Sequence, residues 1–103
     1  MKWFTAVLVL ECLVDGASQE EAELQFRLVR APDQGAALAQ AERLGKGAQE
    51  SYQNHAGEGV TWVFRGLFDL AEIDGAPSEG SELYSMLSDR SIEDLVRRAD
   101  DLG

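Results

Sequence analysis

Residues 3–14, WFTAVLVLECLV, decide the fold of this chain. Every second residue from Phe4 onward is apolar, which gives a β-strand one wholly apolar face. The opposite face mixes apolar residues with Thr5 and Glu11. This pattern predicts a central strand that is covered on one side and partly covered on the other.

The same run begins as a secretory signal peptide does, with Lys2 ahead of apolar residues. Glu11 interrupts it, and no small residues mark a cleavage site. Leu10 and Glu11 stand before Cys12, where a lipoprotein signal needs small residues. The run is also too short to span a bilayer. We therefore interpret it as a buried strand and expect a cytoplasmic protein that does not bind membranes.

The segments that follow predict a hairpin and a helix. Residues 15–18 have the composition of a turn. Residues 24–28 alternate between apolar and polar side chains, which predicts a second strand with one face exposed to solvent. Asp33 is a suitable N-cap for a helix. Small apolar residues recur on one face of that helix and would allow close approach to a sheet: Ala37, Ala41, Leu44 and Ala48.

Two glycines weaken the predicted helix. Gly45 and Gly47 each cost about 1 kcal/mol relative to alanine inside a helix, so we expect a break or a kink there. The period of two returns at Val60 and predicts a third strand, with Phe68 on its apolar face. Gly66 in the same row indicates a bulge or a close approach by another backbone.

The remaining segments complete the predicted fold. Residues 82–87 are expected to form a short fourth strand, and residues 91–101 an amphipathic helix capped by Ser91. The order is then β-β-α-β-β-α within a single domain, residues 1–103. We therefore predict an α+β fold, an antiparallel four-stranded sheet with helices packed on one face.

Composition limits the classes of function. The chain has 103 residues and a formal net charge of −10, and residues 66–103 hold ten acids against three bases. This field repels phosphates and disfavours nucleic-acid binding, whereas it favours a basic partner. Solubility alone explains the same charge. One cysteine excludes an internal disulfide.

The sequence contains few residues that could carry out catalysis. His55 is the one histidine and stands in a polar loop, while Cys12 lies on the apolar face of the first strand, where it acts as a small apolar residue. One histidine and one cysteine cannot fill a zinc site, and no calcium loop or phosphate-binding glycine motif is present. We expect no catalytic residue, cofactor or metal.

Three function hypotheses remain. The first is a non-enzymatic interaction protein, an immunity-like protein or antagonist that caps a basic partner, with a homodimer left open. Its acidic surface would consist of Asp69, Glu72, Asp74, Glu79, Glu82, Asp89, Glu93 and Asp94. The alternative is a small-molecule-binding domain or modest enzyme with a pocket between sheet and helix. The residues of that pocket would be Glu11, Tyr52, His55 and Trp62. The third is a structural or regulatory subunit.

Several segments together resemble a known family. They are WFTAVLVLEC at residues 3–12, RLVRA at 27–31, the alanine-rich helix, Gly57-Glu58 followed by WVFRGL at 62–67, and SELYS at 81–85. In this order they resemble small bacterial proteins of domain-of-unknown-function family 4288, over about residues 3–87. The resemblance implies a small bacterial α+β domain and carries over no activity and no functional residue.

Overall fold

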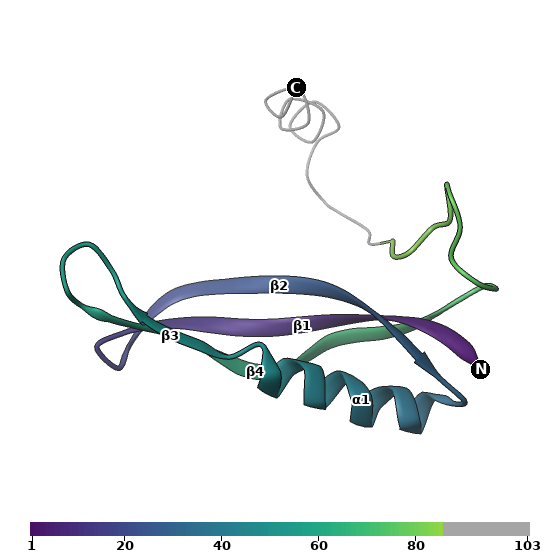
Figure 1. The fold of residues 1–103 in the computed structure, drawn as a ribbon, viewed down its shortest axis with the longest axis horizontal. Helices are drawn as coiled ribbons and strands as arrows, with labels where there is room; N and C mark the ends of the chain where they lie inside the picture. Colours follow the sequence, from purple (N-terminus) through teal and green to yellow (C-terminus); the bar gives the residue numbers. More distant parts are fainter. Residues whose placement is uncertain (86–103) are drawn as a thin grey trace.

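The computed structural model describes residues 1–85, which form one antiparallel four-stranded sheet and one helix (Figure 1). The elements are β1 (Lys2–Val14), β2 (Ala17–Ala31), α1 (Gln34–Gly47), β3 (Glu50–Gln53) and β4 (Gly59–Ile73). The order of the strands in the sheet is β2-β1-β4-β3. The α+β class and the four antiparallel strands agree with the prediction.

The strand β1 is central, as its sequence predicts. It pairs with β2 on one side and with β4 on the other. Its turn to β2 consists of Asp15 and Gly16, both with positive φ (49° and 83°), which matches the right-handed twist of a hairpin. Because this turn starts the pairing at once, β2 accompanies β1 along its whole length and is far longer than the predicted residues 24–28.

The core lies between the sheet and α1. Side chains of β1 from Phe4 to Leu10 on the predicted apolar face are buried against Ala37 and Ala41, both 0% exposed. Asp33 caps the helix, since its Oδ1 accepts a hydrogen bond of 2.8 Å from the backbone N–H of Ala36. The predicted alanine stripe and the predicted cap are both confirmed.

The expected break at the two glycines does not occur. The helix α1 continues to Gly47, and Gly45 is buried. A Cβ at residue 45 would overlap the ring of Phe64 on β4. The glycine therefore serves close packing of α1 on β4, which compensates for its poor helix propensity.

The predicted bulge is present in β4. Its register with β1 shifts twice, between Val9 and Leu10 and between Val7 and Leu8, and Gly66 has φ of 133°. The shifts change which residues face α1, so that Leu67 and Leu70 pack on the core. Phe68 was expected on the apolar face and is instead exposed. A strict period of two fails wherever a bulge inserts a residue.

The predicted order β-β-α-β-β-α is not matched, because residues 1–85 contain one helix, α1. The fourth strand is β3, directly after α1, whereas residues 82–85 form no strand. The sequence ESYQ of β3 is short and polar, so periodicity gave no signal for it. Residues 86–87 and the predicted helix 91–101 lie outside the described residues. Within residues 1–85, no helix has the length and apolar character needed to cross a bilayer.

The second face of the sheet carries no helix in the described part of the chain, and we call it the open face. Thr5 and Val7 of β1 point to it, because their neighbours Phe4, Ala6 and Leu8 face α1. Residues 81–85 return to this face after β4, on the side of the sheet opposite α1 (Figure 1). There the hydroxyl of Thr5 donates a hydrogen bond to the carbonyl of Leu83.

Candidate functional site

The pattern of β2 leaves apolar side chains on the open face. Phe26 pairs with Val7 and Leu24 with Val9, so the apolar side of β2 points away from α1. Leu24, Phe26 and Leu28 are 43%, 54% and 45% exposed. We call these three residues the apolar patch. The polar residues Gln25 and Arg27 alternate with the patch and point to the face of the sheet that α1 covers, because they pair with Leu8 and Ala6.

A groove of about 410 Å³ lies on the same face, between the end of β4 and residues 81–85. Four acidic residues and no basic residue line it, and we call it the acidic groove. They are Asp69, Glu72, Asp74 and Glu82. Glu72 pairs with Phe4, so its side chain points to the helix side, toward Lys2. Residues 66–85 hold five acids and no base, so the negative field here is not compensated along the chain.

The patch and the groove meet at Tyr84. Its ring contacts Phe26 edge-on, with the ring centroids 5.2 Å apart. Its hydroxyl donates a hydrogen bond of 3.1 Å to Oδ2 of Asp69, which also accepts from the N–H of Leu70 through Oδ1. Burial and this hydrogen bond raise the pKa of Tyr84 above its ordinary value. The phenol therefore stays protonated and holds residues 81–85 against the sheet.

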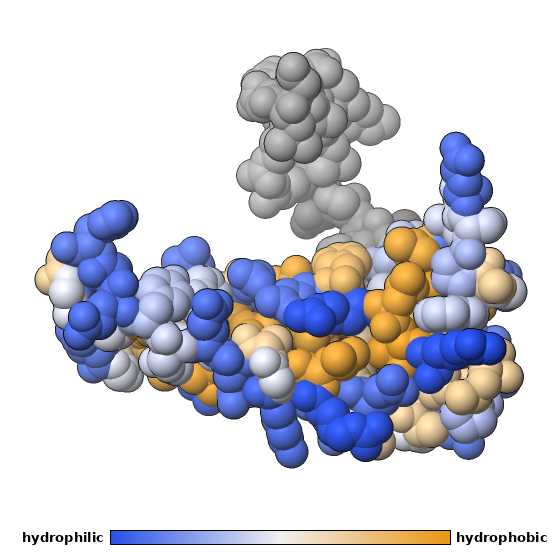
Figure 2. Space-filling model, in the orientation of Figure 1, coloured by the Kyte–Doolittle hydropathy of each residue, from blue (hydrophilic) through white to orange (hydrophobic). Residues whose placement is uncertain are grey.

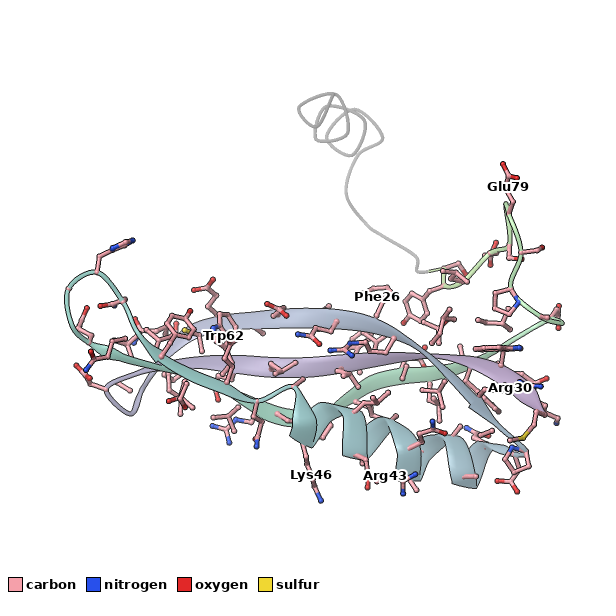
Figure 3. The ribbon with its side chains drawn as sticks, viewed as in Figure 1. Phe26, Arg30, Arg43, Lys46, Trp62 and Glu79 are labelled. Carbon is pink, nitrogen blue, oxygen red and sulfur yellow. The ribbon has the colours of Figure 1, made fainter. Side chains whose placement is uncertain are left out.

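Five members of the predicted acidic surface lie in the described residues. Four line the acidic groove, and Glu79 is exposed on the loop that follows β4 (Figure 3). Oε1 of Glu72 lies 3.6 Å from Nζ of Lys2, and this exposed ion pair offsets the charge of Glu72. Asp89, Glu93 and Asp94 lie outside the described residues.

The four residues of the alternative pocket do not converge. Tyr52 and Trp62 come together across β3 and β4, where the indole N–H donates to the tyrosine hydroxyl at 3.3 Å. Trp62 pairs with Cys12 and packs on the helix side of the sheet, whereas Glu11 lies on the open face. His55 is exposed in the loop between β3 and β4. The described residues therefore bring only two of the four together.

Glu11 has local partners on the open face. One oxygen accepts a hydrogen bond from the hydroxyl of Ser18, and the other accepts one of 2.7 Å from Nε of Arg65. The bond from Ser18, followed by that from Arg65, holds the pKa of Glu11 below its ordinary value. Burial, with a smaller effect from Glu21, raises the pKa of Cys12. Glu11 is thus a paired carboxylate, and Cys12 an inert thiol.

The helix side of the molecule carries several basic side chains. Arg27 and Arg43 line a second hollow of about 410 Å³ between β2 and α1. Arg43 and Lys46 project from α1 on the side away from the open face (Figure 3). Lys46 lies in the last turn of α1, where the helix dipole favours cations. In the described residues, the helix side therefore carries these basic side chains, whereas the open face combines the acidic groove with Arg65 and with Arg30, which lies beside Trp3.

Sequence reasoning did not find the apolar patch. The alternation of residues 24–28 was visible, but the usual expectation directs the apolar side of a strand toward the helices. The two-residue turn at Asp15-Gly16 places Ala17 beside Val14, and a register shift of two residues between Glu11 and Leu13 then brings Leu24 and Phe26 beside Val9 and Val7. Because the shift is even, the turn indicates which side of β2 shares a face with Val7 and Val9, but not the partners themselves. Figure 2 shows apolar residues along the middle of the molecule and hydrophilic residues at the β3–β4 loop.

Comparison with known proteins places the chain in a family. The model of the family described as "Domain of unknown function (DUF4288)" matches residues 3–85, most of the chain, and the chain belongs to this family. No curated protein and no solved structure matches the chain. Among the described residues, no three His, Cys, Asp or Glu side chains are placed together to hold a metal ion.

Proposed function

We propose that this chain is a protein-interaction domain that binds a basic partner protein through its open face. The observation that carries the proposal is the direction of β2, which presents the apolar patch to solvent instead of to α1. Large apolar side chains that are grouped on one face and bordered by polar residues mark interaction sites in soluble proteins.

The acidic groove supplies the charge preference of this face. It adjoins the patch through the contact between Phe26 and Tyr84. An interface core that is apolar and a rim that is charged is the usual arrangement for protein partners. A partner that fits would present apolar side chains to the patch and lysine or arginine side chains to the groove, and the charges would speed its association.

In its most specific form, the proposal is that this chain acts as an antagonist of its basic partner. A protein that covers a basic surface of its target blocks whatever anionic molecule that surface binds. In this form the chain needs no catalytic group, which agrees with the dispersed positions of Glu11, His55 and Trp62. A rigid sheet presents the patch at little entropic cost.

The test compares two neutralised variants of equal net charge. The groove variant carries Asp74→Asn and Glu82→Gln, and the control carries Glu50→Gln and Glu58→Gln at exposed sites elsewhere. Immobilised wild-type chain is exposed to lysate of its native cell. Each captured protein is purified, and its affinity for all three chains is measured by calorimetry at two salt concentrations.

We expect to capture a basic protein that binds the wild type and the control with equal affinity and the groove variant at least about tenfold more weakly. Its affinity for the wild type should fall as the salt concentration rises. Equal binding to both variants would contradict the proposal. A photo-crosslinking side chain at Phe26 adds an independent readout. Crosslinks confined to residues 86–103 of the same chain would mean that this segment occupies the face, and would overturn the proposal.

A further inference from the structure

The outer edge of β2 is unpaired in the described part of the chain. The strand is outermost in the sheet, and its pairing with β1 is regular from Ala22 to Ala31, without a bulge. Its sequence contains no glycine, proline or lysine. A long, regular edge exposes a row of N–H and C=O groups, and natural proteins interrupt such edges unless another strand pairs with them.

The opposite side of the sheet shows those interruptions. The strand β3 has four residues, and β4 beyond its pairing with β3 contains two register shifts around Gly66 and Phe68. Short strands and bulges prevent edge pairing. Among the described residues, β2 has the longer regular edge of the two sides, from Ala22 to Ala31, and a register shift at residues 19–21 precedes it.

Along β2, the acidic residues come before the middle of the strand and the basic residues come after it. Gln25 donates to Oε1 of Glu23, and the guanidinium of Arg27 donates to Oε1 of Gln25 at 2.8 Å. These three residues form one row on the helix side of the strand, with Gln25 in the middle. Within the described residues, Arg27 has no carboxylate within ion-pairing distance. Glu23, the other charged residue of this row, is linked to Arg27 only through the neutral side-chain amide of Gln25.

We propose that two copies of this chain pair through β2, antiparallel, with Gln25 of each copy on the two-fold axis. Residues equidistant from Gln25 then face each other across the axis. Glu23 of one copy faces Arg27 of the second, both within the regular stretch from Ala22 to Ala31. Leu24 faces Phe26, so the rows on both sides of the strand are self-complementary.

The charges select this register. Within the regular stretch from Ala22 to Ala31 the acid is Glu23 and the bases are Arg27 and Arg30, whereas Glu20 lies in the irregular stretch before it, with φ of 53°. A two-fold axis normal to the sheet brings residues on the same side of the strand opposite each other. Glu23 can therefore face Arg27 and not Arg30, which lies on the open face beside Trp3. The register centred on Gln25 forms this pair on each side of the axis, and it places no like charges opposite each other.

The dimer extends the surface already described. A two-fold axis normal to the sheet keeps both α1 helices on one side and both apolar patches on the other. The two patches then adjoin, since Phe26 of each copy lies beside Leu24 of the second. This inference does not depend on the proposed basic partner, because the pairing involves the purified chain alone.

The test exploits the symmetry of the axis. Glu23→Arg and Arg27→Glu each place like charges opposite each other twice in the dimer, and the dissociation constant of each variant should rise about tenfold or more. An equimolar mixture of the two variants should restore dimers, because each acid then meets a base in the heterodimer. The double variant should dimerise as the wild type does. Sedimentation equilibrium of the full chain measures all four, and Glu50→Arg on β3 is the matched control.

A second measurement fixes the register. Only residue 25 faces its own copy, so Gln25→Cys should form an intermolecular disulfide on mild oxidation much faster than Leu28→Cys, which faces Ala22. Cys12 is buried and should not take part. A monomeric wild type would overturn the proposal, and so would a dimer that neither reversal weakens. Equal crosslinking at positions 25 and 28 would contradict this register.

Discussion

The ring of Phe64 on β4 fills the space where a side chain of Gly45 on α1 would begin. The helix can approach β4 this closely only because residue 45 has no Cβ. Phe64 in turn packs on the core formed by β1, Ala37 and Ala41. The pair therefore sets how closely the helix approaches the sheet at β4.

This relationship predicts opposite effects for the two glycines of α1. Gly45→Ala should lower the free energy of unfolding by about 1–3 kcal/mol, because the ring must move out of a packed site. Gly47→Ala has nothing within 4 Å of the new Cβ and should raise stability by about 0.5–1 kcal/mol through helix propensity. Urea unfolding of both variants gives the comparison. If Gly45→Ala were also stabilising, the contact with Phe64 would not limit the packing.

Tyr84 anchors residues 81–85 to the open face, and its two contacts can be separated. Tyr84→Phe keeps the ring against Phe26 and loses the bond to Asp69, which should cost about 0.5–1 kcal/mol. Tyr84→Ala loses both contacts and uncovers the region of Thr5, and should cost about 1–3 kcal/mol. Amide hydrogen exchange at Thr5 and Val7 should accelerate only in the alanine variant. Unchanged stability in both variants would mean that this segment does not hold the sheet.

Burial of Cys12 predicts low thiol reactivity. The side chain is 6% exposed on the helix side of β1, and the raised pKa keeps it protonated at mildly alkaline pH. A disulfide reagent should therefore label the folded chain at least about tenfold more slowly than the chain in denaturant. Ser51→Cys, at an exposed position on β3, is the control and should react fast in both states. Fast labelling of Cys12 in the folded chain would contradict its position in the core.

The sequence predicted the parts of this fold that follow a regular period, and failed where the period breaks. The faces of β1, the cap at Asp33 and the alanine stripe of α1 follow from spacing alone. Phe68 was misplaced because two bulges in β4 change the facing of its residues, and Gly66 could indicate a bulge but not its consequence. The sequence ESYQ of β3 has no apolar alternation, since it is an exposed edge.

The site was less predictable than the fold. The carboxylates of the acidic groove follow from charge clustering, but their meeting in one groove depends on residues 81–85, which return across the sheet instead of forming a strand. The apolar patch depends on which side of β2 the helix occupies, and no local pattern of residues 24–28 specifies that. Such relations arise from the register between strands and need tertiary structure.

Glu11 predicts how stability responds to acid. Its pKa is lowered in the folded chain, so the unfolded chain binds the proton more readily, and the stabilisation is fully present above the ordinary carboxylate pKa. It is lost as the pH falls from that value through the lowered one. Arg65→Gln should raise the pKa of Glu11 without restoring it fully, because the hydrogen bond from Ser18 remains.

Carboxyl NMR titration measures this shift, and Arg43→Gln removes the same charge on α1 as a control. The stability difference between wild type and Arg65→Gln should be largest near neutral pH and shrink as the solution is acidified. A difference that stayed constant on acidification would mean that Arg65 stabilises the chain by packing against β1 and not through the charge of Glu11, and a difference that grew would carry the wrong sign for a lowered pKa.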